Sequence, residues 1–254
     1  MKHKIVAGIP TKNEGWVLEK ILKRLSTFCY KIIVNDDQSE DNTREICESF
    51  DKVEYYERPV HDWRERQGGA QRQEILDYCY KHDPDYFLFV DADEVPTPDI
   101  VDFFENHIDE NVVLWTLPWY HLWGDEEHYR VDDYYAGPSH IKWDPENGGQ
   151  RKGFIVKNVR DFQLKYDAAQ HRVRPSNQPI NCPEPHSTTE KTRILHYGKL
   201  NPRFLSGQNF YERATWDNYQ RGADIQSTIN MHQGANSIKT LKVRELQPEW
   251  KWKI

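Results

Sequence analysis

The chain has 254 residues, of which 37% are hydrophobic and 13% aromatic, which is enough for one full-sized core and too little to require two. Its net charge of −7 and pI near 5.9 argue against a protein that binds nucleic acid, because such proteins usually carry a concentrated basic face. No apolar run approaches the roughly 18 residues of a membrane span, and the N-terminus lacks a signal-peptide pattern. We therefore expect a cytoplasmic, single-domain protein without a transmembrane segment, whose partners are small molecules or neutral polymers.

Strands and helices alternate along the first half of the chain. Apolar runs predict strands at residues 4–10, 31–37, 53–59, 86–91 and 111–120. Helical spacing predicts helices at residues 14–25, 41–50 and 70–81, and a further helix after Thr97. We expect Asp41 or Asn42 to cap the second helix and Thr97 to cap the fourth. The alternation predicts an α/β fold of Rossmann-like type, with a mostly parallel sheet and helices on both faces.

The second half of the chain breaks this rhythm. Residues 121–192 are rich in aromatic residues, His, Gly, Pro and Asp with little periodicity, so we expect irregular loop structure there. A helix is predicted over residues 201–220. The tail, residues 241–254, is predicted to be a short strand or an arm packed by Trp250 and Trp252.

Polar side chains follow the carboxyl ends of three predicted strands. The first strand ends in PTKNE, the second in NDDQSED and the fourth in DADE. Ligands of open parallel sheets bind beyond these ends, so we expect one site there. Asp91 and Asp93 can turn toward one point, where carboxylate oxygens suit Mn²⁺ or Mg²⁺. Such a cation would relieve the repulsion between the carboxylates, and it usually completes its shell with water and phosphate, which indicates a diphosphate ligand.

Four segments carry a family resemblance: IPTKNEGWVLEKIL, IIVNDDQSEDNT, GGAQRQEIL and LFVDADE. In this order they resemble the nucleotide-binding half of family-2 glycosyltransferases, whose fold is called GT-A, over roughly residues 3–118. The resemblance implies a single GT-A domain at 1–254, with a nucleotide-sugar-binding half at 1–118 and an acceptor-binding half at 119–254. It implies transfer of a sugar from a nucleotide-diphosphate sugar, with a UDP-sugar favoured, to a hydroxyl acceptor such as a glycan, with inversion.

The resemblance also implies roles for single residues. Those that would border the donor nucleotide are Pro10, Thr11, Glu14, Asp37, Arg72, Asp91 and Ala92. Among them Asp37 would contact the base, Arg72 the base or a phosphate, and Asp91 the ribose. Asp93 would hold the metal ion.

A downstream segment, TRILHYGKLNPRF, resembles the HYG segment near the end of many such enzymes. His196 could complete the metal shell or meet the diphosphate, and Lys199 and Arg203 could neutralise the leaving diphosphate; a solvated helix end is the structural alternative. An inverting transfer needs a carboxylate base beside the acceptor hydroxyl. Asp132 and Asp133 are the candidates, because they lie among aromatic residues that suit a saccharide, although a solvated acidic loop would also explain them.

Two other classes of protein remain open. A sugar-nucleotide pyrophosphorylase, which is a nucleotidyltransferase, would share the sheet and the metal, but GIPTKNEG does not supply a glycine-rich basic loop for phosphates. A non-catalytic carbohydrate-binding protein could use the tryptophans alone and would not need acidic clusters at neighbouring strand ends. Gln38 stands where glycine is frequent in the family and Gln73 where asparagine is frequent, which leaves the donor class open.

Overall fold

The computed structural model describes seven stretches of the chain: residues 1–59, 68–130, 151–158, 164–167, 172–175, 186–202 and 243–253. The chain forms two compact units. Unit 1 contains Met1–Leu117, Lys152–Ile194 and Glu249–Ile254, and unit 2 contains Pro118–Arg151 and Leu195–Pro248. Unit 1 is therefore assembled from three separate stretches of the sequence.

Unit 1 begins with regular alternation of strands and helices. Its first elements are β1 (Ile5–Thr11), α1 (Gly15–Ser26), β2 (Lys31–Asp36), α2 (Thr43–Glu48), β3 (Val53–Glu57), α3 (Gly68–Tyr80) and β4 (Tyr86–Phe89). These elements confirm the strands and helices predicted for this part of the chain. The five α1 residues whose spacing defines its apolar face are all buried: Val17, Leu18, Ile21, Leu22 and Leu25.

Shorter elements follow. In unit 1 they are β5 (Glu94–Pro96), α4 (Ile100–Asp102), the π-helix η2 (Phe103–His107), β9 (Leu164–Asp167), β10 (Arg172–Pro175) and β11 (His186–Thr188). Unit 2 holds β7 (His128–Arg130), the 3₁₀ turn η4 (Gly198–Leu200) and β13 (Val243–Glu245). The boundary between the units crosses β6 (Leu114–His121), β8 (Arg151–Lys157), of which only Arg151 belongs to unit 2, β12 (Ile194–His196) and the 3₁₀ turn η5 (Pro248–Trp250).

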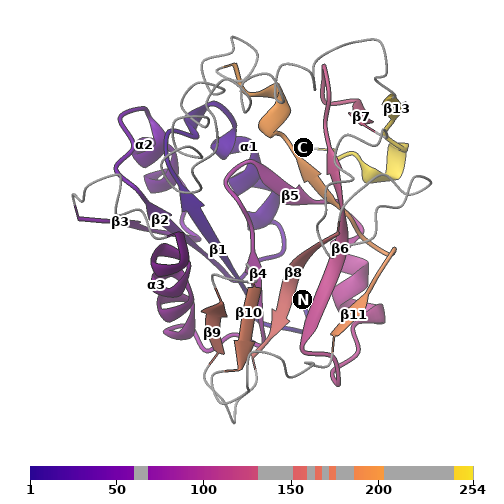
Figure 1. The fold of residues 1–254 in the computed structure, drawn as a ribbon, viewed down its shortest axis with the longest axis horizontal. Coiled ribbons are helices and arrows are strands. Elements are labelled where there is room, and N and C mark those ends of the chain that lie inside the picture. The colour runs from indigo at the N-terminus through magenta and orange to yellow at the C-terminus, as the bar shows by residue number, and fades with distance from the viewer. Residues whose placement is uncertain are drawn as a thin grey trace, which may run out of the picture. The chain divides into compact units, whose positions relative to one another are not determined.

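The main sheet has the strand order β3-β2-β1-β4-β8-β6-β12-β5, and β11 pairs with β6 (Figure 1). β1 runs parallel to β2 and β4, and β2 runs parallel to β3. β8 is antiparallel to β4. The mostly parallel α/β sheet is therefore confirmed, and the carboxyl ends of β2, β1 and β4 lie at one edge of it.

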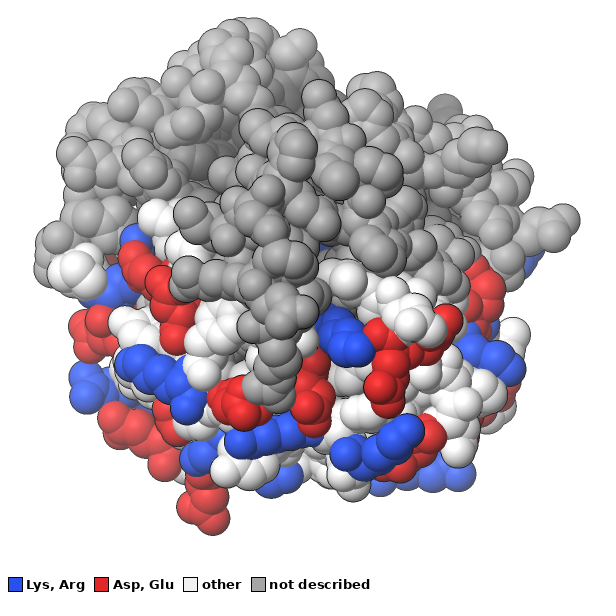
Figure 2. Space-filling view, turned by 90° about the horizontal axis from the view of Figure 1, so that it is seen from below, with Lys and Arg blue, Asp and Glu red and all other residues white. Residues whose placement is uncertain are grey.

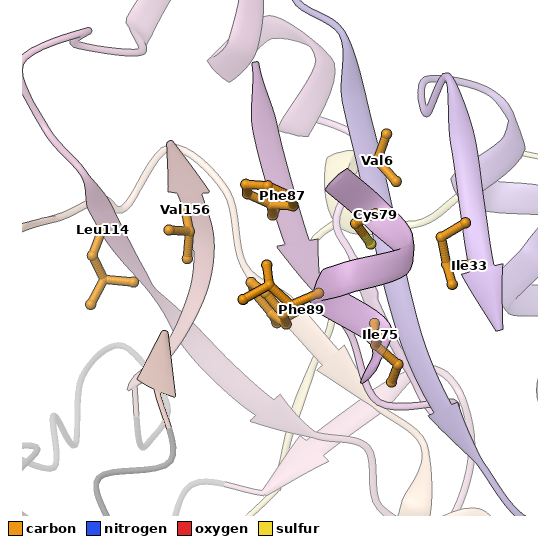
Figure 3. Close-up of a cluster of buried hydrophobic side chains, with 9 residues drawn as sticks. Val6, Ile33, Ile75, Cys79, Phe87, Phe89, Leu114 and Val156 are labelled. Carbon is orange, nitrogen blue, oxygen red and sulfur yellow. The ribbon is translucent and has the colours of Figure 1, made fainter. Parts of the chain in front are cut away.

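The core of unit 1 fills the space between the sheet and α3. Ile75 and Cys79 of α3 pack against Val6, Ile33 and Phe87 of the strands (Figure 3). Gly8 in β1 allows this close approach, because a Cβ atom there would lie 2.3 Å from Cγ2 of Ile75. The packing fixes α3, and with it Arg72, against the sheet.

Two predictions about single segments are wrong. The helix after Thr97 begins at Ile100, because the Thr97 hydroxyl accepts the N–H of Arg193 at 2.9 Å instead of capping a helix. Residues 121–192 are not irregular throughout, since they contain β8 inside the main sheet. In β8 the consecutive residues Phe154, Ile155 and Val156 are buried, which is typical of a central strand covered on both faces.

The tail contains the predicted short strand, β13, which pairs with β7 in unit 2. In unit 1, Trp252 stacks on Phe28 with ring centroids 6.4 Å apart, and its indole N–H donates to the carbonyl of Pro96 at 2.8 Å. Most of the helix predicted at 201–220 lies outside the described residues. None of the helices in the described stretches is long and apolar enough to cross a membrane. Figure 2 shows acidic and basic side chains interspersed on one face of the described surface.

Gly8→Ala should destabilise the protein by about 1–3 kcal/mol, because the new methyl group would overlap the Ile75 side chain in a packed core. The matched control is Gly153→Ala in β8, whose Cβ would lie 3.4 Å from Leu114, an ordinary contact distance. Urea unfolding of both variants measures the difference. Equal stability of the two variants would contradict the assigned packing of α3 on β1.

Candidate active site

The register of β1 and β2 brings two predicted donor-binding segments together. Pro10 and Thr11 end β1, and Thr11 lies opposite Asp36 in the parallel ladder. The next residue, Asp37, continues the pairing, since its backbone N–H donates to the carbonyl of Thr11 at 2.9 Å. Asp37 is therefore fixed next to the end of β1, as the sequence pattern predicts.

Asp37 is only 5% exposed, and its charge is balanced from within the chain. Nη1 of Arg58 lies 3.4 Å from Oδ1 of Asp37. The same guanidinium is held by Glu74 of α3, with Nε–Oε2 and Nη2–Oε1 distances of 2.9 and 3.1 Å. Sequence reasoning missed Arg58, although it directly follows β3, a strand end at the same edge of the sheet. The arrangement holds the Asp37 carboxylate, a hydrogen-bond acceptor, beside the Arg58 guanidinium.

Gln38 adopts a left-handed backbone conformation with φ of 61°. Glycine is favoured in this region because it has no Cβ atom to clash with the backbone. This gives a physical reason for the glycine that is frequent at the position. Here the Gln38 amide donates to the carbonyl of Arg58 at 3.2 Å, which links this turn to the partner of Asp37.

The DADE segment forms a closed turn after β4. The N–H of Glu94 donates to the carbonyl of Asp91 at 3.0 Å, and the N–H of Asp91 donates to Oε2 of Glu94, also at 3.0 Å. Ala92 and Asp93 occupy the two central positions of this turn. Glu94 is completely buried, so its carboxylate is a structural part of the turn and does not face a ligand.

Two cationic side chains, from elements far apart in the sequence, form ion pairs with Asp91. Arg72 of α3 forms an ion pair with Oδ1, and Nζ of Lys152 in β8 lies 2.6 Å from Oδ2. Lys152 also contacts both carboxylate oxygens of Glu94, at 2.8 and 2.6 Å. Burial alone would raise the pKa of Asp91, but the charges of Arg72 and Lys152 outweigh burial and hold that pKa well below its usual range.

These contacts correct one expectation. The repulsion expected between Asp91 and Asp93 does not need a metal ion at Asp91, because the chain supplies two cations there itself. Arg72, expected to approach the base or a phosphate, is paired with Asp91 in this structure. Lys152 was missed because it lies in the part of the chain predicted to be irregular.

The charge of Asp93 also acts on Glu14. Burial, and next the charge of Asp93, raise the pKa of Glu14 from its ordinary value of 4.5 to about 8, with smaller contributions from Asp41 and Asp91. A hydrogen bond from the Trp16 indole at 2.7 Å opposes this rise. Carboxyl groups that lie close together offer the hard oxygen atoms that Mn²⁺ and Mg²⁺ prefer as ligands. Within the described stretches, no three His, Cys, Asp or Glu side chains form a complete metal site, so water and phosphate oxygens would have to supply the remaining ligands.

The predicted residues from the second half fall in a different unit or outside the described residues. In unit 2, Nδ1 of His196 lies 2.7 Å from Nδ1 of His121, so one ring must donate and the other accept. The ring of Trp119 lies 4.4 Å from that of His121 and 5.0 Å from that of His196. Asp93 belongs to unit 1, so a metal ion shared with His196 stays a prediction.

His121 was not predicted, and no local pattern marks it as a site residue. Lys199 lies in η4, directly after the segment that contains His196. The candidate bases Asp132 and Asp133, and the predicted diphosphate ligand Arg203, lie outside the described residues.

Comparison with known proteins identifies relatives of this chain. The model of the family described as "Glycosyl transferase family 2" matches residues 7–173. S. aureus TarS, residues 1–349, has a similar structure, with a TM-score of 0.51 at 13% sequence identity over 92% of this chain and 72% of that one. Glucosyl-3-phosphoglycerate synthase from Mycobacterium tuberculosis, in complex with Mn²⁺, UDP-Glc and phosphoglyceric acid, gives a TM-score of 0.47 at 14% identity, over 85% and 79%. A search of the curated proteins found no match.

Glu14→Gln should flatten the dependence of stability on pH. Because the pKa of Glu14 is raised from 4.5 to about 8 in the folded protein, its stabilising contribution is complete below pH 4.5 and is lost as the pH rises through 8. The free energy of unfolding of the variant should not show this decrease with rising pH. Each unit of pKa shift corresponds to about 1.4 kcal/mol, so the decrease in the wild type amounts to at most a few kcal/mol. Urea unfolding at about pH 5 and pH 8 measures it, with Glu19→Gln on the exposed side of α1 as the control. Identical slopes for the two variants would contradict the shift.

Proposed function

Because the chain belongs to glycosyl transferase family 2, we propose that it transfers a sugar from a UDP-sugar to a hydroxyl group of a glycan or another acceptor, with the help of Mn²⁺ or Mg²⁺. The observation that carries the proposal is the position of Asp37, Glu14 and Asp93, which follow the carboxyl ends of three adjacent parallel strands, β2, β1 and β4. Nucleotides bind at this edge in open α/β sheets.

Asp37 supports a donor whose base offers an N–H group. Its carboxylate lies beside Arg58, and a carboxylate accepts hydrogen bonds. The imide N–H of uracil is such a donor. A crystal structure of S. aureus TarS in complex with UDP is known, which makes UDP the first nucleotide to test.

Asp93 is the residue proposed to hold the divalent cation, which would stabilise the negative charge that develops on the departing diphosphate. Lys199 and Arg203 are proposed to contribute further positive charge to that leaving group. His196 is proposed to complete the metal shell or to contact the diphosphate.

Inversion at the anomeric carbon requires a carboxylate that removes the proton from the acceptor hydroxyl on the face opposite the leaving group. Asp132 or Asp133 is proposed for this role. The aromatic residues near them in the sequence suit the apolar face of a sugar ring, which supports a saccharide acceptor.

Asp37→Ala should weaken UDP binding in the presence of Mn²⁺ by about 1–3 kcal/mol, because one charge-assisted hydrogen bond to the base is lost. Isothermal calorimetry measures the affinity. Asp51→Ala, which removes an exposed carboxylate before β3, is the control and should bind UDP like the wild type. Unchanged affinity of Asp37→Ala would refute the assignment of Asp37 to the base.

Asp93→Asn should have opposite effects on stability and activity. The melting temperature in chelator should stay the same or rise, because the amide keeps the shape of the side chain and removes the repulsion with Glu14. Hydrolysis or transfer of a UDP-sugar in Mn²⁺ should be largely lost, because the cation is no longer held. Full turnover would contradict the metal role of Asp93, and an unfolded variant would indicate a structural role.

A further inference from the structure

The turn that carries Asp93 depends on a residue from outside the nucleotide-binding half. Lys152 comes from β8, the antiparallel strand next to β4. Its ammonium lies within 2.8 Å of three carboxylate oxygens, two from Glu94 and one from Asp91, the residues at the two ends of the turn. It therefore holds the ends of the turn together, in addition to the two hydrogen bonds between Asp91 and Glu94.

Burial makes this contact strong. The Glu94 side chain is fully buried, and that of Lys152 is 21% exposed. A buried carboxylate without a cation is costly, so Glu94 and Lys152 hold each other in place. The pKa of Lys152 is raised by Asp91 and Glu94 in spite of burial, which would lower it, so the ammonium stays charged.

We propose that Lys152 is a positioning residue for the cation site: by clamping Asp91 and Glu94 it fixes the turn that presents the Asp93 carboxylate. The inference rests on the proposed function, and it adds to that function a residue that does not itself contact the nucleotide. A lysine already engaged with two carboxylates is poorly suited to bind a phosphate directly. Some residues orient a metal ligand without contacting the metal ion. Removing such a residue commonly weakens metal binding by about 10–100-fold.

Four proteins test the role of Lys152: wild type, Lys152→Met, the double variant Lys152→Met with Glu94→Gln, and Lys157→Met. Lys157 lies in the same strand and donates to the carbonyl of Glu110, away from the turn, so its variant is the matched control. UDP affinity is measured by calorimetry in Mn²⁺ and in chelator, and stability by thermal unfolding.

Lys152→Met should melt at a lower temperature, because Glu94 is left buried without its cation. The double variant should recover most of that loss, since the unpaired charge is gone. In both variants the Mn²⁺-dependent gain in UDP affinity should fall by about 10-fold or more, whereas affinity in chelator should change much less. Lys157→Met should behave like the wild type.

Three results would overturn the inference and leave the proposed donor site in place. If the double variant recovers the full Mn²⁺-dependent gain, Lys152 only neutralises Glu94 and does not position Asp93. If UDP affinity falls as much in chelator as in Mn²⁺, Lys152 acts on nucleotide binding without the cation. If Lys152→Met keeps the wild-type gain, the clamp has no role in cation binding. A wild-type protein that binds no UDP, or binds it without any effect of Mn²⁺, would overturn the proposed donor site itself, and the inference with it.

Discussion

Charge balance at the carboxyl end of β4 is the constraint on which the candidate site depends. Carboxylates that are removed from water are costly unless cations lie beside them. Asp91 and Glu94 are balanced by Arg72 and Lys152, and these ion pairs fix the shape of the turn. Glu14 and Asp93 place further carboxyl oxygens close together at the same edge of the sheet, since the charge of Asp93 raises the pKa of Glu14. Such hard oxygen atoms suit a divalent cation.

Much of unit 1 was predictable from the sequence because its signals are local. The apolar face of α1 repeats with the helical period, and the buried runs of β1, β2 and β4 stand out from polar neighbours. Once those strands are taken as parallel, their carboxyl ends must share one edge, which places Asp37 and the DADE segment there without knowledge of any side-chain contact. Thr97 shows the limit of a local signal. Its hydroxyl suits a helix cap, but a contact with Arg193, far away in the sequence, uses it instead.

The partners of the site residues could not be predicted, because each depends on a long-range pairing. Lys152 reaches Asp91 only because β8 enters the sheet antiparallel to β4, and its three buried residues are too short a run to indicate that position. Arg58 reaches Asp37 only because Glu74 of α3 holds its guanidinium. The contact between His121 of β6 and His196 of β12 likewise joins residues that are 75 positions apart in the chain.

A common arrangement supports the two aspartates at this edge. Asp37 is backed by Arg58 and Glu74, and Asp91 by Lys152 and Glu94, so in each case two carboxylates share one cation. Asp91 is also paired with a second cation, Arg72. The carboxylate of Asp37 suits the N–H of a base, whereas the two cations beside Asp91 reduce its repulsion of a diphosphate. Because these ion pairs already exist in the free protein, less ordering is required when a nucleotide binds, and one sheet edge can accept a hydrogen-bond donor and an anion side by side.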